Sequence, residues 1–252
     1  MIQISNLILE VTRKCNLQCT HCLRGNAQRL VMSNDVLFNT MRSVESVCTL
    51  TITGGEPSLA PEVLENLLQM LYWQKVSIGA FYIVSNGMPH NRYRRFLTAI
   101  ERLYSWCDEK DACTLTVSRD QFHPNFDTYQ QAHKFELREE ETGQPYGEFP
   151  PYFRLNERHN QIFRVLSEGR ALETGWGNEA PEQQTPWELN TEGDYVIDPL
   201  VYVSANGNVV SCCNMSFDRI DRESKGNVLE TSLPAILESY CTCQVEEQES
   251  MA

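Results

Sequence analysis

The chain has 252 residues and 41% hydrophobic content, enough for one sizeable core with a smaller appendage. A formal net charge of −13, without a stripe of lysine and arginine, disfavours binding to a nucleic-acid backbone, which needs a basic surface. No apolar run approaches the length of a membrane span and the N-terminus lacks a signal-peptide pattern, so we expect a cytoplasmic protein with no membrane partner. Ten cysteines in such a chain indicate metal or redox chemistry rather than disulfides.

The first predicted element is a buried strand over residues 7–11, and three closely spaced cysteines follow it. Cys15, Cys19 and Cys22 have the spacing C-x3-C-x2-C on a loop that leaves the carboxyl end of this strand. Clustered thiolates suit a soft metal centre. Structural zinc sites and iron–sulfur clusters normally take four protein ligands, whereas the local set here stops at three. Three thiols would leave one iron of a cluster open to bind another molecule; a zinc knuckle or a set of buried thiols is the alternative.

Predicted strands and helices then alternate along the chain. Ser33 offers the N-cap of the first helix and Pro61 opens the second. The predicted helices cover residues 34–47, 61–71, 91–106 and 126–140. The predicted strands cover residues 49–53, 81–84, 113–117 and 162–166, with a sixth strand near 196–203. This alternation indicates βα units and a parallel sheet, and in α/β barrels the carboxyl ends of the strands carry the active site.

Glycine and polar residues follow three of these strands. They are Gly54-Gly55-Glu56-Pro57, Ser85-Asn86-Gly87 and Ser118-Arg119-Asp120. Glycine lets the backbone approach a bulky cationic ligand closely, and a carbonyl or carboxylate there can accept a hydrogen bond from an ammonium group. Ordinary turns and a solvated loop are the structural alternatives.

The cysteine spacing and the Gly54-Gly55-Glu56-Pro57 sequence one βα unit later resemble the signature of the radical S-adenosylmethionine (radical SAM) enzymes. The resemblance implies an α/β fold, a partial (β/α)6 TIM-like barrel, to which we assign residues 1–190. It implies that Cys15, Cys19 and Cys22 hold a [4Fe–4S] cluster whose open iron binds S-adenosylmethionine. In this family a reductant such as flavodoxin or ferredoxin supplies the electron that cleaves this cofactor, and the resulting 5′-deoxyadenosyl radical abstracts hydrogen from the substrate.

The same resemblance implies roles for the residues at the strand ends. Those expected to bind the cofactor are Gly54, Gly55, Glu56, Pro57, Ser85, Asn86, Ser118 and Asp120, with Arg119 as an alternative contact to the carboxylate. His123 and Arg170 are candidates for catalysis, and Arg24 and Arg170 are candidates for carboxylate binding. The alternatives are a plain loop histidine and surface ion pairs of the two arginines.

The C-terminal segment, residues 191–252, has a pattern of its own. A hairpin with an Asn206-Gly207 turn is predicted over residues 201–212, followed by a helix over 233–240. This segment resembles the SPASM and twitch auxiliary-cluster domains in truncated form, because residues 191–200 hold no cysteine. Four cysteines could hold a second iron–sulfur cluster, a zinc ion or nothing: Cys212, Cys213, Cys241 and Cys243. We predict a cap over the open rim of the barrel, without a second cluster.

The resemblance predicts the class of reaction but does not identify the substrate. Because SPASM and twitch domains are common in peptide-maturing members, a peptide or protein substrate is the leading expectation. Radical modification of a nucleotide or another small molecule is the alternative among enzymes. From another class, the alternative is a non-catalytic metal-binding protein that uses the cysteines structurally.

Overall fold

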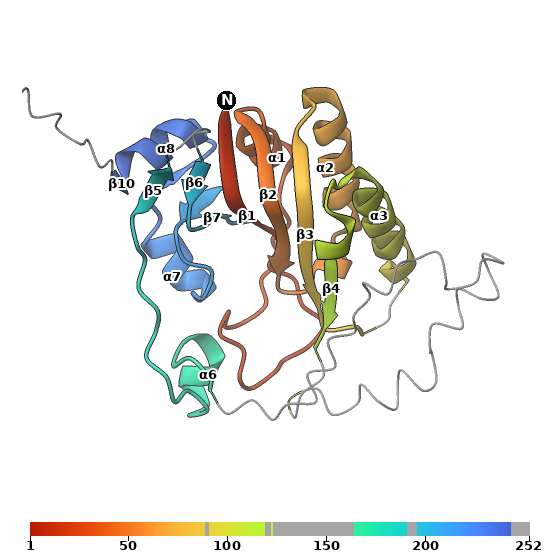
Figure 1. Ribbon diagram of the computed structural model, residues 1–252. Coiled ribbons are helices and arrows are strands. Elements are labelled where there is room, and N and C mark those ends of the chain that lie inside the picture. Colours follow the sequence, from red (N-terminus) through yellow and green to blue (C-terminus); the bar gives the residue numbers. More distant parts are fainter. Residues whose placement is uncertain (89–90, 119–121, 123–163, 191–195, 243–252) are drawn as a thin grey trace, which may run out of the picture.

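The computed structural model describes residues 1–88, 91–118, 122, 164–190 and 196–242, and one ten-stranded sheet runs through them (Figure 1). Four neighbouring parallel strands form one side of this sheet, in the order in which they occur in the chain. They are β1 (Ile2–Thr12), β2 (Val44–Gly54), β3 (Ser77–Ser85) and β4 (Thr114–Val117). Since these strands are parallel, their carboxyl ends meet at one edge of the sheet, the lower edge in Figure 1.

Three helices connect these strands and pack side by side against the sheet. They are α1 (Asn34–Met41), α2 (Pro61–Gln74) and α3 (Tyr93–Trp106). In α2, Leu64, Leu67 and Leu71 are buried, as their helical spacing predicts. Burying each leucine contributes about 1.5–3 kcal/mol, so this face fixes the helix on the sheet. Ser33 caps α1 as predicted, because its hydroxyl accepts a hydrogen bond from the Val36 amide.

The predicted helix over residues 34–47 is too long. The structure ends α1 at Met41 and begins β2 at Val44. Val44 lies opposite Ile2 in the parallel ladder, and Val44 and Val47 are both buried. Pairing with β1 therefore makes β2 begin earlier in the chain than predicted. The local sequence does not show this pairing, because it depends on a distant strand.

The strand predicted near residues 196–203 is two short strands. β6 (Val196–Asp198) pairs with the start of β1 and β7 (Val201–Val203) pairs with its middle, both in parallel. Beyond β6 lie β5 (Trp187–Asn190) and then β10 (Cys241–Thr242). β1 is thus paired along one edge with β2 and along the other with strands from the C-terminal part of the chain.

The predicted fifth strand, residues 162–166, is not formed in its described part. Residues 164–166 contribute only an isolated bridge between Leu166 and Glu179, and a short helix, α6 (Gly169–Glu173), follows. The polar helix predicted over residues 126–140 lies outside the described residues. In the described part of the chain the strand order runs from β10 to β4, whose edges do not pair, so the barrel is open.

The C-terminal hairpin is confirmed. β7 pairs antiparallel with β8 (Asn208–Val210), and the turn between them has Gly207 at φ +90°, a conformation that favours glycine. The elements that follow are α7 (Phe217–Arg222), β9 (Gly226–Asn227) and α8 (Leu233–Ser239). The structure is therefore an open α/β barrel with a C-terminal hairpin and helix, as predicted. We predicted a domain boundary between residues 190 and 191. Because strands before and after this point belong to the same sheet, the boundary stays a prediction.

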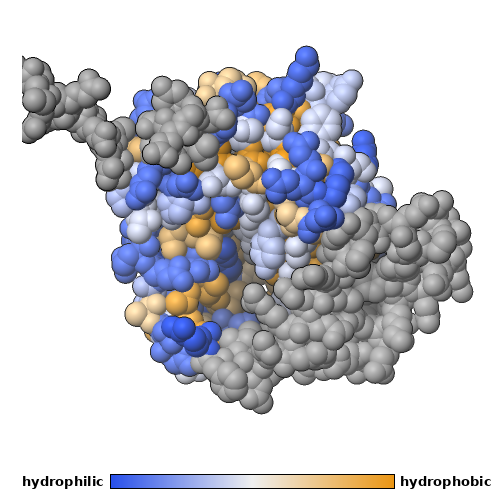
Figure 2. Space-filling view, in the orientation of Figure 1, coloured by the Kyte–Doolittle hydropathy of each residue, from blue (hydrophilic) through white to orange (hydrophobic). Residues whose placement is uncertain are grey.

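The described surface facing the viewer in Figure 2 is mainly hydrophilic, with apolar surface lower on the left, in the region of α6. Leu172 in this helix is 62% exposed. None of the described helices combines the length and the apolar character that crossing a bilayer requires.

Candidate metal and cofactor site

The three N-terminal cysteines lie on the loop between β1 and α1, residues 13–33, which we call the cysteine loop. Cys15, Cys19 and Cys22 are all partly buried. Burial, together with the nearby Glu56, Cys22 and Cys19 groups, raises the pKa of the Cys15 thiol to about 11, although the hydrogen bond from the Leu17 amide opposes the rise. Among the described residues, no three His, Cys, Asp or Glu side chains converge tightly enough to hold a single metal ion. A [4Fe–4S] cluster offers a separate iron to each cysteine, so its ligands need not converge on one point.

Gly54, the last residue of β2, and Gly55, which follows it, are required by the cysteine loop itself. A Cβ on Gly54 would lie 2.2 Å from the Thr12 carbonyl oxygen, and one on Gly55 would lie 2.4 Å from the Lys14 carbonyl oxygen. Two hydrogen bonds of 2.7 Å join the same segments, from the Gly55 amide to Thr12 and from the Glu56 amide to Lys14. We expected these glycines to let the backbone approach a ligand. In the structure they let it approach the Thr12 and Lys14 backbone, which leads into Cys15.

Glu56 joins the ends of β2 and β3. Its buried carboxylate accepts hydrogen bonds from the Ser58 amide and hydroxyl, from the Ser85 hydroxyl at 2.8 Å and from the Asn86 amide at 2.7 Å. Burial raises the pKa of Glu56, although these donors oppose the rise. The carboxylate also caps the 3-10 turn that begins at Pro57, the last residue of the predicted cofactor-binding sequence.

Asn86 connects this network to the cysteine loop. Its side-chain amide nitrogen donates to the Asn16 side-chain oxygen at 2.9 Å and lies 3.9 Å from the Cys15 sulfur. A second donor, the Leu17 amide, lies 3.4 Å from the same sulfur. Donors directed at a thiolate stabilise its charged form and tune a metal bound to it. The structure therefore brings Glu56, Ser85 and Asn86 together beside Cys15.

The rim after β4 is described only in part. The Ser118 amide donates to the Ser85 carbonyl at 2.9 Å, so this predicted residue lies next to the end of β3. Asp120, Arg119 and His123 lie outside the described residues. Phe122 is described: its ring stacks on His21 at a centroid distance of 3.9 Å and meets Trp176 edge-on at 5.0 Å.

Arg170 holds the backbone of the cysteine loop. Its guanidinium donates to the Cys19 carbonyl at 2.8 Å and to the Gly25 carbonyl at 3.0 Å, and its amide donates to the Cys22 carbonyl at 2.9 Å. Gly169 precedes it at φ +56°, where a Cβ would lie 2.1 Å from the Leu23 carbonyl oxygen. These contacts are not those of a surface ion pair, and catalysis and carboxylate binding by Arg170 stay predictions. In this structure Arg170 positions the loop that carries the cysteines.

The side chain of Arg24 also contacts other residues of the protein. Its guanidinium donates to the Met215 carbonyl at 2.6 Å and lies 5.2 Å from the centre of the Tyr202 ring. Burial lowers the pKa of this arginine, but Tyr202 and Glu10 more than compensate and the pKa is raised. Arg24 thus links the cysteine loop to the C-terminal segment.

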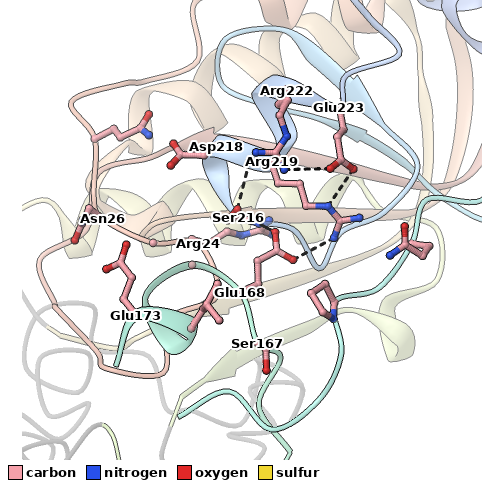
Figure 3. A pocket seen from close by; sticks show the side chains of 16 residues that line it. Arg24, Asn26, Ser167, Glu168, Glu173, Ser216, Asp218, Arg219, Arg222 and Glu223 are labelled. Carbon is pink, nitrogen blue, oxygen red and sulfur yellow. Dashed lines mark hydrogen bonds and ion pairs between the residues drawn. The ribbon is translucent and has the colours of Figure 1, made fainter. Parts of the chain in front are cut away.

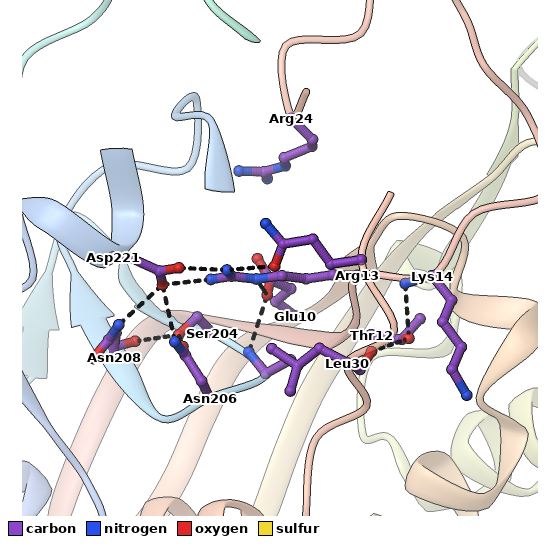
Figure 4. Close-up of polar contacts among 12 residues, drawn as sticks. Glu10, Thr12, Arg13, Lys14, Arg24, Leu30, Ser204, Asn206, Asn208 and Asp221 are labelled. Carbon is purple, nitrogen blue, oxygen red and sulfur yellow. Dashed lines mark hydrogen bonds and ion pairs between the residues drawn. The ribbon is translucent and has the colours of Figure 1, made fainter. Parts of the chain in front are cut away.

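A buried polar network at the base of the cysteine loop was missed by sequence reasoning (Figure 4). Arg13 is 1% exposed and binds Glu10 at 2.7 Å and Asp221 at 2.6 and 2.8 Å. Glu10 also accepts a hydrogen bond from the Tyr202 hydroxyl at 2.6 Å. The available signal was a charged residue, Glu10, inside a strand predicted to be buried, since such a charge needs a partner.

A cavity of about 710 Å³ lies beside the cysteine loop, between α6 and α7 (Figure 3). Its walls carry charges of both signs. Arg219 binds Glu168 at 3.2 Å and Glu223 at 3.0 Å, which ties α7 to the start of α6. The lining residues that belong to the cysteine loop are Arg24, Gly25, Asn26 and Gln28.

The structure distributes the C-terminal cysteines over two hydrophobic clusters. Cys212 is buried with Ile8 and Tyr202, and Cys213 packs against this group. Cys241, in β10, packs against the main core instead. Cys243 lies outside the described residues.

Two of the solved structures that match this chain share its fold. A structure of BtrN in complex with AdoMet (S-adenosylmethionine) and 2-DOIA is 15% identical, with a TM-score of 0.51, over 93% of this chain and 82% of BtrN. A structure of anSMEcpe with bound AdoMet and Cp18Cys peptide is also 15% identical, with a TM-score of 0.51, over 94% of this chain and 80% of anSMEcpe. No protein-family model and no curated protein sequence matches the chain. The chain therefore has the open α/β barrel fold of these two AdoMet-bound structures, as the resemblance to radical SAM enzymes predicts.

Proposed function

We propose that the chain is a radical SAM enzyme, with a [4Fe–4S] cluster at Cys15, Cys19 and Cys22 and S-adenosylmethionine beside it. The observation that carries this proposal is the position of Asn86. Its side chain lies 3.9 Å from the Cys15 sulfur while its backbone amide binds Glu56. Three segments that resemble the family separately in sequence thus meet at one rim of the sheet, the same rim that carries active sites in α/β barrels.

The residues present fit these groups chemically. The three thiols lie on one loop close enough to influence one another, and soft thiolates are the ligands that iron–sulfur clusters take. When bound, the cluster and S-adenosylmethionine together supply a radical that removes hydrogen from a substrate. The protein's part is to hold the three thiols, through Arg170 and Asn86, and to keep solvent from the site.

A peptide or protein is the proposed substrate, and a reductant such as flavodoxin or ferredoxin is the proposed electron donor. The peptide is supported by anSMEcpe, whose matching structure holds a Cp18Cys peptide. A small-molecule substrate is the second candidate, because the matching structure of BtrN holds 2-DOIA. The mixed charges of the cavity between α6 and α7 suit a polar substrate of either kind.

The test is anaerobic reconstitution followed by measurement of iron and of 5′-deoxyadenosine. The wild-type chain should bind about four irons, as one [4Fe–4S] cluster requires, and should form 5′-deoxyadenosine from S-adenosylmethionine under reduction. Replacing Cys15, Cys19 and Cys22 by alanine should abolish both, whereas Cys48→Ala, at an exposed cysteine, should change neither.

Two outcomes would contradict the proposal. Full iron content in the triple variant would place the metal elsewhere. Tight binding of zinc without any cleavage of S-adenosylmethionine would instead support a non-catalytic metal-binding protein.

A further inference from the structure

We infer that Asp221, in the C-terminal segment, is a positioning residue for the cysteine loop and acts on it through Arg13. The ion pair joins residues 208 positions apart in the chain. The inference rests on the proposed function only where it concerns the cluster, because the contact between the two segments stands on its own.

Arg13 closes the base of the cysteine loop. Its amide donates to the Leu30 carbonyl and its carbonyl accepts from the Gln28 amide, both at 3.0 Å, so its backbone binds the far end of the loop. Its guanidinium also binds the Gln28 side chain at 3.1 Å. Only Lys14 separates Arg13 from Cys15. A shift of the Arg13 side chain would therefore move both ends of the loop that carries the cysteines.

The guanidinium is held from the C-terminal side with well-defined geometry. Both oxygens of Asp221 accept hydrogen bonds from it, at 2.6 and 2.8 Å, which is the bidentate arrangement that fixes orientation as well as distance. The ring of Phe217, in the same helix α7, lies 4.8 Å from the guanidinium carbon. The face of the Arg13 guanidinium contacts the Phe217 ring and its edge binds the Asp221 carboxylate. Because both partners belong to α7, this helix determines where the guanidinium lies.

Asp221 is itself fixed by the hairpin. The side-chain amides of Asn206 and Asn208 donate to its Oδ1 atom at 2.9 and 3.0 Å. Figure 4 shows these amides and the arginine converging on the one carboxylate from different sides. The hairpin and α7 thus hold the Asp221 carboxylate together. Through its bonds to this carboxylate, Arg13 fixes the cysteine loop relative to the hairpin and α7.

The experiment compares Asp221→Asn with Glu65→Gln. Glu65 binds Arg95 through both of its oxygens, but on the exposed surface of α2 and α3, so it is a matched control with the same chemistry in another place. The first readout is the rate at which Cys15, Cys19 and Cys22 are alkylated in reduced, metal-free protein, followed by peptide mass spectrometry. The second readout is the EPR spectrum and midpoint potential of the reconstituted cluster.

Asp221→Asn should accelerate alkylation of the three cysteines about tenfold, because losing a charge-assisted pair lets the loop open more often. It should also shift the potential and the EPR spectrum, while Glu65→Gln leaves both readouts as in the wild type. Asp221→Glu, which keeps the carboxylate, should restore slower alkylation and most of the spectrum. Unchanged alkylation and an unchanged spectrum in folded Asp221→Asn would overturn the inference.

Folding is checked by circular dichroism. Should Asp221→Asn not fold, Asn206→Ala, which removes one of the two amides that hold the carboxylate, is measured in its place. Faster alkylation in that variant supports the inference and an unchanged rate overturns it. The alkylation readout needs no metal, so a wild-type chain that binds no iron would contradict the proposed function while the role of Asp221 is still decided.

Discussion

The carboxylate of Glu56 accepts a hydrogen bond of 2.7 Å from the backbone amide of Asn86, which joins the end of β2 to the end of β3. The Ser58 amide donates to one oxygen of Glu56 and the Asn86 amide donates to the other, so a glutamine there would direct an N–H group at another N–H donor in either orientation. We expect Glu56→Gln to lower the free energy of unfolding by about 1–3 kcal/mol, the penalty for an unsatisfied buried group. Urea denaturation measures the change.

The control for this variant is Glu62→Gln, since Glu62 pairs with Arg92 on the exposed surface. That substitution should change stability by less than about 1 kcal/mol, as exposed ion pairs contribute little. Equal effects of the two substitutions would show that Glu56 does not connect the strands.

Gly55→Ala should disturb the cysteine loop as well as the cofactor. The added methyl group would lie 2.4 Å from the Lys14 carbonyl oxygen, and backbone atoms cannot move aside without shifting Cys15. We expect lower iron content after reconstitution together with weaker binding of S-adenosylmethionine in calorimetry. Gly175→Ala is the control for backbone strain: alanine is strained there at φ +74°, but its Cβ meets nothing within 4 Å, so the variant has the strain without a clash against the cysteine loop. Normal iron content with loss of cofactor binding alone would show that the glycine serves only the ligand.

Arg170→Ala should weaken retention of the cluster. The variant loses the guanidinium hydrogen bonds to the carbonyls of Cys19 and Gly25. Removing such donors leaves carbonyls unpaired at the loop, so iron should be lost to a chelator about tenfold faster. Arg164→Ala, which removes an exposed pair with Glu179, should leave the rate unchanged. A direct catalytic role would appear differently, as normal iron retention with little 5′-deoxyadenosine.

Replacing Cys212, Cys213, Cys241 and Cys243 by serine should leave total iron unchanged. The described members of this set pack in two separate hydrophobic clusters, which is typical of cysteines that act as small apolar residues. Iron and sulfide analysis of the reconstituted variant tests this. A fall of several irons per chain would demonstrate a second cluster.

The ion pair of Asp221 predicts a pH dependence of stability. Burial acts to raise the pKa of this carboxyl, but hydrogen bonds from Arg13 and Asn206 outweigh it and the pKa is lowered. A lowered folded-state pKa gives stability that is present above the ordinary aspartate pKa and is lost as the pH falls through the folded value. The difference in unfolding free energy between the wild type and Asp221→Asn should therefore be constant near pH 7 and shrink below about pH 4. A difference that grows in acid would contradict the assigned ion pair.

The sequence by itself determined the features that depend on neighbours in the chain. Short apolar and β-branched runs marked β1 to β4, and the Asn206-Gly207 turn marked the hairpin of β7 and β8. The cysteine spacing and the glycines after β2 indicated a site at the rim, because spacing along a loop is a local property. Where tertiary pairing competes with local preference, as at Val44, the predicted boundary was wrong.

Only the tertiary structure decided how the cysteine loop is held. Its supports are Asn86, Arg170 and the pair of Arg13 with Asp221, which lies 208 residues away. No periodicity or spacing marks such partners, since each bond depends on which strands become neighbours in the sheet. Glu10 gave the one local hint, a charge within a buried strand, and the fold supplied Arg13 and the Tyr202 hydroxyl as the partners that this burial requires.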